Sequence, residues 1–266
     1  MNREETLEIM QRYKILPEKR FGQNFLCNDD ITDLIISESG IEPSSRVLEI
    51  GPGIGALTRK IAGMKADITA VEIDLRLASY LKEDLPSVKV IASDFLKIKR
   101  EDIGPFDRII SNIPYYVMTP IMNKLLSGFS DALSMTFMVE ESALARIKAS
   151  YGTKQYGPLS VLVSLYGEFN KVINVPDSAF IPRPNTLSSV ITLKRTDEHS
   201  DVLCPEFLAF LETSFSQRRK KYLNSLGAVC GREKASSVIS AVGLDENVRA
   251  EDIRPEIFRK IFDLIR

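Results

Sequence analysis

Short β-rich runs of hydrophobic residues recur along the first half of the chain. A stretch that can form a helix follows each run. Strands that alternate with helices in this way are typical of a parallel sheet wrapped by helices. The pattern therefore predicts an α/β domain whose strands are Arg46–Ile50, Ile68–Ile73, Val88–Ala92, Phe106–Ser111 and Leu133–Val139.

Two further strands are predicted beyond these runs. Asp177–Pro184 is rich in turn-forming residues and lies between the strand-like runs Phe169–Val175 and Ser189–Lys194. We expect these two runs to form a hairpin-like pair at the end of the sheet.

The C-terminal part has a different pattern. Arg195–Asp201 is polar, and from Pro205 onwards apolar residues recur at helical spacing without a strand signal. We therefore expect a first domain over residues 1–196 and a small all-helical domain over residues 197–266. The helical spacing is carried by Phe207, Phe210, Leu211, Phe215, Ile257, Ile261, Phe262 and Ile265.

Composition limits the class of protein. The chain has 266 residues, of which 44% are hydrophobic and 27% charged, so it is neither a small stapled scaffold nor a disordered protein. Its apolar runs are too short to cross a bilayer, and its first residues have no apolar core typical of a secretory signal. We expect a cytoplasmic protein without a membrane partner.

The residues that commonly bind metals are few. Cys27, Cys204 and Cys230 are far apart, and His199 is the only histidine, which argues against a metal site and against His-based catalysis. The 35 Lys and Arg residues nearly balance the 36 Asp and Glu residues. A nucleic-acid partner would therefore have to be held by local patches of charge.

A glycine-rich loop follows the first predicted strand. The sequence Glu49-Ile50-Gly51-Pro52-Gly53-Ile54-Gly55 opens a predicted helix, and its glycines allow a ligand close to the backbone. Its spacing is one residue shorter than that of the dinucleotide fingerprint. A purely structural turn is the alternative.

Acidic residues follow the next two strands. Glu72 is placed to accept hydrogen bonds from both hydroxyls of a ribose, and Asp94 to read the amino group of an adenine. Together with the glycine loop, they predict a nucleoside-bearing ligand at three strand ends. The alternative is that both carboxylates cap helices.

The most specific motif is Asn112-Ile113-Pro114-Tyr115, after the fourth strand. The Asn112 side-chain oxygen and the Ile113 carbonyl can accept both hydrogens of an exocyclic adenine amine. Pro114 keeps the turn rigid, and Tyr115 can stack on a flat target. Positioning and electrostatics would then supply most of the catalysis without a conventional base. A strand-to-helix turn with a buried tyrosine is the alternative.

These motifs resemble those of the ribosomal RNA small-subunit adenine dimethyltransferases, which use S-adenosylmethionine. The resemblance begins at Phe21–Leu26 and runs over nearly the whole chain. It implies a Rossmann-like methyltransferase domain with a mostly parallel sheet, followed by a helical domain that recognises RNA. The donor site that it implies is Gln23, Asn24, Leu26, Gly51, Gly53, Glu72, Ile73, Asp94, Phe95 and Asn112. For Gln23 and Asn24 a helix cap is the alternative.

The resemblance also extends to Ser178–Pro184. This segment is similar to a family loop whose aromatic residue covers the second face of the extruded base. The catalytic group that the resemblance implies is therefore Asn112, Ile113, Pro114, Tyr115 and Phe180. Without the resemblance, Phe180 would more often be a core residue.

Four adjacent cations follow the stripe of phenylalanines near the C-terminus. The segment from Phe215 to Leu226 resembles the first helix of the family's small domain, so Arg218, Arg219, Lys220 and Lys221 are implied phosphate contacts. A solvated charged face is the alternative. The chain departs from the family at Asn185-Thr186, where a valine is frequent, and at Glu18-Lys19-Arg20, where the family is often more basic.

The resemblance implies dimethylation of the N6 amines of two adjacent adenosines in a hairpin loop near the 3′ end of small-subunit rRNA. It implies a partly assembled small ribosomal subunit as the partner. A monomer is the default expectation, and the small number of metal-binding residues predicts an enzyme that needs no metal. Three alternatives stay open: a macrolide-resistance methylase of large-subunit rRNA, a glutamine methyltransferase acting on a protein, and a non-catalytic assembly factor.

Overall fold

The computed structural model describes residues 1–196 and 202–266, which form two compact units. His199 and most of the predicted polar linker lie outside the described residues. Each unit is built from separate stretches of the chain, and unit 2 includes residues that precede residue 196. Unit 1 comprises Met1–Ile121, Asp131–Ser142 and Phe169–Arg195, and unit 2 comprises Met122–Ser130, Ala143–Glu168 and the described part of Thr196–Arg266.

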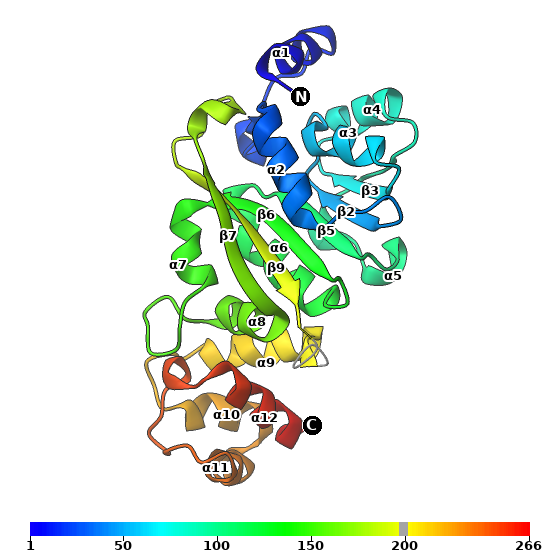
Figure 1. Ribbon diagram of the computed structural model, residues 1–266. Helices are drawn as coiled ribbons and strands as arrows, with labels where there is room; N and C mark the ends of the chain where they lie inside the picture. The colour runs from blue at the N-terminus through cyan, green and yellow to red at the C-terminus, as the bar shows by residue number, and fades with distance from the viewer. Residues whose placement is uncertain (197–201) are drawn as a thin grey trace. The chain divides into compact units, whose positions relative to one another are not determined.

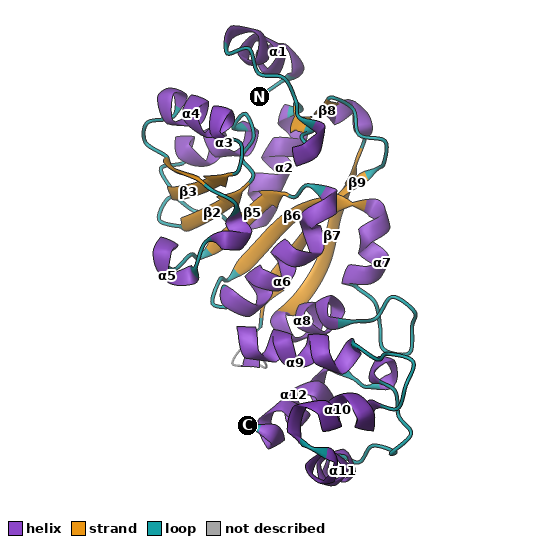
Figure 2. Ribbon diagram, turned by 180° about the vertical axis from the view of Figure 1, so that it is seen from behind, coloured by secondary structure: helices purple, strands orange, loops and turns teal. Residues whose placement is uncertain are grey.

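Unit 1 contains a seven-stranded sheet with the order β4-β3-β2-β5-β6-β9-β7 (Figure 2). The five predicted strands pair in parallel, and β9 runs antiparallel to β6, which confirms a mostly parallel α/β sheet. The expected pair at the end of the sheet is also present, because β7 lies beside β9. The strands are β2 Arg46–Ile50, β3 Asp67–Glu72, β4 Lys89–Ala92, β5 Arg108–Asn112, β6 Ser134–Glu140, β7 Gly167–Val175 and β9 Ser188–Arg195.

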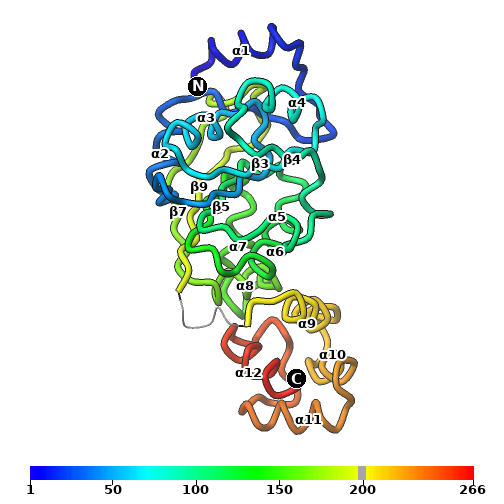
Figure 3. Tube along the Cα trace, turned by 90° about the vertical axis from the view of Figure 1, so that its right-hand side faces the viewer, coloured from blue at the N-terminus to red at the C-terminus, as the bar shows by residue number. Residues whose placement is uncertain are grey.

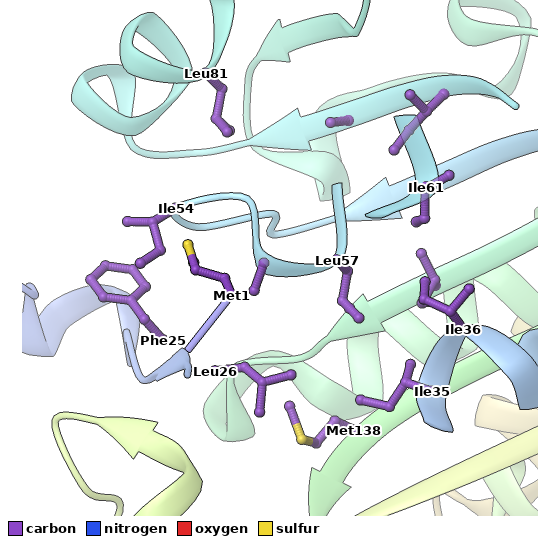
Figure 4. Close-up of a cluster of buried hydrophobic side chains, with 14 of the residues drawn as sticks. Met1, Phe25, Leu26, Ile35, Ile36, Ile54, Leu57, Ile61, Leu81 and Met138 are labelled. Atoms are coloured by element: carbon purple, nitrogen blue, oxygen red, sulfur yellow. The ribbon is translucent and has the colours of Figure 1, made fainter. Parts of the chain in front are cut away.

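Three helices lie beside one face of this sheet (Figure 1). Their apolar side chains belong to a buried cluster shown in Figure 4. Ile35 of α2, Leu57 of α3 and Leu81 of α4 belong to one buried cluster together with Val47 of β2 and Met138 of β6. The helices are α1 Arg3–Arg12, α2 Asp29–Ser39, α3 Ala56–Gly63, α4 Leu75–Asp84, α5 Arg100–Ile103 and α6 Met118–Gly128. This packing fixes the strand ends that carry the predicted motifs.

A second, two-stranded sheet joins the N-terminal segment to the turn-rich segment Asp177–Pro184. In it, β1 (Phe25–Leu26) pairs antiparallel with β8 (Phe180–Ile181), and Leu26 lies opposite Phe180. These strands are not predictable from the sequence, because two residues are too few to display an alternating pattern.

Unit 2 is helical and has an aromatic core. Phe207 packs edge-on against Phe262 with a centroid distance of 5.1 Å, and Phe258 lies 5.8 Å from Tyr222. Figure 3 follows the last four of these helices from yellow to red. The helices are α7 Leu144–Ile147, α8 Pro158–Tyr166, α9 Pro205–Phe215, α10 Tyr222–Cys230, α11 Arg232–Ala241 and α12 Pro255–Ile265. Within the described residues, none of the helices has the length and apolar character of a membrane span.

Gly55 provides a test of the turn between β2 and α3. Its φ is +84°, and a Cβ there would lie 2.9 Å from Cδ2 of Leu81. We expect Gly55→Ala to lower the free energy of unfolding by about 1–3 kcal/mol, measured by urea denaturation. Gly63→Ala is the control because a Cβ at Gly63 meets no atom within 4 Å. Equal stability of the two variants would contradict this account of the turn.

Candidate functional site

A pocket lies at the carboxyl ends of β2, β3 and β5. The register places Ile50 opposite both Val71 and Ser111, so the next residues Gly51, Glu72 and Asn112 form one row across the three strands. The chain order reverses between β2 and β5, which is where open α/β sheets bind ligands. Besides this row, the pocket lining includes Phe21–Leu26, Glu49, Pro52–Ile54, Ala56, Leu57, Ile73, Leu77 and Ile113–Tyr115.

The glycine loop is tied to the neighbouring strand. The Gly51 amide donates to the Val71 carbonyl at 2.9 Å, and the Gly53 amide donates to Oε2 of Glu72 at 3.0 Å. Gly53 has a φ of +59°, and a Cβ there would lie 3.1 Å from the Phe25 ring. The absence of a side chain at Gly53 therefore lets Phe25 approach the loop.

Glu72 is almost fully buried at the floor of this turn. Its Oε1 accepts a hydrogen bond from the Asp74 amide at 2.9 Å, in addition to the Gly53 bond on Oε2. Burial raises the pKa of Glu72 to about 7. A carboxylate can accept about four hydrogen bonds, so two further donors, such as a pair of hydroxyls, can be accommodated.

Glu49 is a second buried carboxyl that lines the pocket, and it is not among the site residues expected from the sequence. Only 2% of the residue is exposed, and its Oε2 has no hydrogen-bond partner in the described structure. Burial, with a smaller contribution from Glu72, raises the pKa of Glu49 to about 8. The Thr58 side chain acts in the opposite direction and lowers this pKa. The unpartnered Oε2 leaves room for one further hydrogen bond. The signal in the sequence was an acidic residue just before the glycines.

The third acidic residue in this region, Asp74, has a structural role. It caps α4 by accepting from the Arg76 amide at 3.0 Å, and it also accepts from Nε2 of Gln23 at 3.0 Å. Although burial acts to raise it, hydrogen bonds from Arg76 and Gln23 lower the pKa of Asp74 to about 2. Gln23 thus lines the pocket, and its side-chain amide ties the segment Phe21–Leu26 to the start of α4.

The motif Asn112–Tyr115 forms one wall of the pocket. Nδ2 of Asn112 donates to the Asn24 carbonyl at 3.2 Å, which leaves the Asn112 side-chain oxygen as the acceptor. Pro114 has a φ of −59°, and a 3₁₀ turn begins at Tyr115. The Tyr115 hydroxyl is 2.7 Å from Oγ of Ser188, and burial raises the Tyr115 pKa, so the phenol stays neutral.

Most of the expected donor-site residues line this pocket, but two do not. Gln23, Asn24, Leu26, Gly51, Gly53, Glu72, Ile73 and Asn112 are part of the lining. Asp94 instead accepts from the Leu96 amide at 3.0 Å and caps a short 3₁₀ turn, and Phe95 is buried. Their expected part in the donor site stays a prediction.

Phe180 also lies away from the pocket lining. Its ring is only 1% exposed and belongs to the hydrophobic cluster behind β1. Tyr115 and Phe180 therefore do not form an open stacking pair in this arrangement, and the expected sandwich stays a prediction. Phe180 lies opposite Leu26 in the two-stranded sheet, and both residues belong to this cluster.

The cationic cluster occupies a turn in unit 2 rather than a helix, because α9 ends at Phe215 and α10 begins at Tyr222. Arg218 donates to Oε2 of Glu251 and to the Thr153 carbonyl, both at 2.7 Å, so it is bound internally. The next three cations, Arg219, Lys220 and Lys221, are exposed. Over the described ranges, the chain has no group of His, Cys, Asp and Glu suited to a metal ion.

Comparison with known proteins yields consistent matches. A model of the family "Ribosomal RNA adenine dimethylase" matches residues 16–266. "Ribosomal RNA small subunit methyltransferase A" of Clostridioides difficile (strain 630) is 34% identical over 277 residues, covering 98% of this chain and 94% of the relative.

Two solved structures resemble the whole fold. A dimethyladenosine transferase from Plasmodium falciparum has a TM-score of 0.73 and 25% identity, covering 89% of this chain and 95% of that one. The 23S rRNA methyltransferase ErmE has a TM-score of 0.62 and 26% identity, covering 91% and 99%.

Glu49 makes the stability of the ligand-free protein depend on pH. Its carboxyl has an ordinary pKa of 4.5 in the unfolded chain and a pKa of about 8 when folded. The stability of the wild type relative to Glu49→Gln should therefore be highest below the unfolded pKa and fall as the pH rises through the folded pKa. Urea unfolding between about pH 5 and pH 9 measures this difference. Glu83→Gln, at an exposed position, is the control, and parallel curves for wild type and Glu49→Gln would be the contrary result.

Proposed function

Because the chain belongs to the ribosomal RNA adenine dimethylase family, we propose that it dimethylates the N6 amines of two adjacent adenosines in small-subunit rRNA, with S-adenosylmethionine as donor. The observation that carries the proposal is the row of Gly51, Glu72 and Asn112 across three strand ends, with Tyr115 beside it. A nucleoside bound along this row would lie next to acceptors for an amine.

The pocket residues fit the donor. S-adenosylmethionine supplies a methyl group that is activated by a positively charged sulfonium. Glu72 retains acceptor capacity for both ribose hydroxyls, and the unpartnered Oε2 of Glu49 can accept from an ammonium group. Burial makes ionisation of Glu49 and Glu72 unfavourable in the ligand-free pocket. A ligand with net positive charge would stabilise their ionised forms.

Asn112 and Ile113 would orient the target amine. The lone pair of an adenine amine is delocalised into the ring, so the amine is a weak nucleophile. Two acceptors, Oδ1 of Asn112 and the Ile113 carbonyl, would hold its hydrogens and favour a pyramidal nitrogen. Tyr115 would stack on the base, and Pro114 would keep the turn rigid. Such catalysis acts by positioning and electrostatics.

Two kinds of ribosomal RNA are candidate substrates. The relative named for the small subunit is 34% identical to this chain and covers 98% of this chain's length. ErmE, which is named for 23S rRNA, is 26% identical. These values favour the small subunit. We further propose that the adenosines lie in a hairpin loop near the 3′ end, presented by a partly assembled subunit.

The test is transfer of labelled methyl groups from S-adenosylmethionine to small ribosomal subunits that lack the modification. Mass mapping should find dimethyladenosine at two adjacent loop positions. Label in large-subunit rRNA would select the macrolide-resistance type, and label in protein would select a glutamine methyltransferase. Donor binding without any transfer would contradict the proposal and favour an assembly role.

Asn112→Ala should abolish methyl transfer and leave most donor binding intact. The substitution removes an acceptor for the amine, whereas Glu72 and the glycine loop remain. Single-turnover transfer and calorimetric donor titration measure the two effects separately. Normal turnover by the variant would rule out the proposed mechanism.

The exposed cations should contribute to RNA affinity through phosphates. Replacing Arg219, Lys220 and Lys221 by glutamine should weaken binding to small subunits and reduce the slope of log K against log salt by about 2 to 3. Arg218 is left intact because it is paired with Glu251. A matched control replaces the exposed lysines 82, 89 and 99 of unit 1. An unchanged slope would support a solvated face.

A further inference from the structure

The Tyr115 hydroxyl is hydrogen-bonded to a residue from a distant part of the chain. Oγ of Ser188 lies 2.7 Å from it, and Ser188 is fully buried. Ser188 is the first residue of β9 and lies opposite Glu140, the last residue of β6. Since β6 separates β5 from β9, this bond links the two strands on either side of β6 at the edge of the pocket.

This bond restrains the orientation of the Tyr115 ring. The backbone holds one end of the side chain in the turn after β5, and Ser188 holds the other end. A ring fixed at both ends presents one plane to anything that stacks on it. Geometry of this kind matters for methyl transfer, because small errors in the placement of reacting atoms lower the rate strongly.

We propose that Ser188 is a positioning residue for methyl transfer, whose hydroxyl sets the plane of the Tyr115 ring on which the target adenine stacks. The inference rests on the proposed function of the pocket, and it adds a residue to which no site role is assigned by the sequence motifs. Ser188 acts through Tyr115 and has no contact of its own with the base.

The two successive methylations of one adenine should depend on Ser188 to different degrees. The unmodified amine offers two hydrogens to Asn112 and Ile113, whereas the monomethylated amine offers only one. The second transfer therefore relies more on stacking to hold the base. Loss of the Ser188 hydroxyl should slow the second transfer more than the first, so that monomethyladenosine accumulates.

The adjacent residue Ser189 provides a matched control. It is equally buried and is the second residue of the same strand, but successive side chains of a strand point to opposite faces. Its hydroxyl bonds to Glu141 and, at 3.1 Å, to Oδ1 of Asn174. Ser189→Ala therefore removes a buried hydroxyl from the same strand end and leaves Tyr115 untouched.

The experiment measures both transfer rates and the ratio of monomethyl to dimethyl product on small subunits for Ser188→Ala, Tyr115→Phe and the double variant. We expect each single variant to slow the second transfer about tenfold, as loss of one hydrogen bond allows. The double variant should be no slower than Tyr115→Phe, and Ser189→Ala should keep the wild-type product ratio. Donor dissociation constants and thermal unfolding identify any variant that is misfolded.

A pair of isosteric substitutions separates the hydroxyl from packing. Ser188→Thr keeps a hydroxyl and Ser188→Val does not, while both add the same volume. Dimethylation should be retained better by Ser188→Thr than by Ser188→Val. Equal product ratios for this pair, or additive effects of Ser188→Ala and Tyr115→Phe, would overturn the inference. Absence of dimethyladenosine with the wild-type protein would instead refute the proposed function.

Discussion

The parallel register of β3, β2 and β5 is the constraint on which the site depends. Pairing places Gly51, Glu72 and Asn112 in one row, although the sequence separates them widely. Neighbouring strands lie about 4.8 Å apart, so the row spans about 10 Å across the three strands. The bond from the Gly53 amide to Glu72 then fixes the glycine loop to that row.

The burial of two carboxyls at this edge of the sheet is unfavourable for folding. Glu49 and Glu72 are both nearly fully buried, and both have raised pKa values. The same carboxyls would supply acceptors to the cationic, hydroxyl-bearing donor of the proposed function, and its binding would offset this cost. Asp74, only two residues from Glu72, is fully paired and serves the fold instead. Neighbouring acidic residues therefore have different tasks, set by which groups surround them.

The sequence was sufficient to predict the strands of the seven-stranded sheet, the helical C-terminal part and most of the pocket lining, because periodicity and strand-end motifs are local signals. The sequence alone could not show that Phe180 is buried or that Asp94 caps a turn. Phe180 lies opposite Leu26 in a two-residue strand pair, and Asp94 meets its partner only in the folded turn. Likewise, pairing of Arg218 with Glu251 joins positions that no local pattern relates.

The most direct test of the central claim is a structure of the protein with a non-reactive analogue of S-adenosylmethionine. We expect both ribose hydroxyls to lie within hydrogen-bond distance of Glu72, and the group that replaces the methyl to point towards the Asn112 side-chain oxygen. An analogue bound elsewhere, or bound in this pocket with its ribose away from Glu72, would contradict the account.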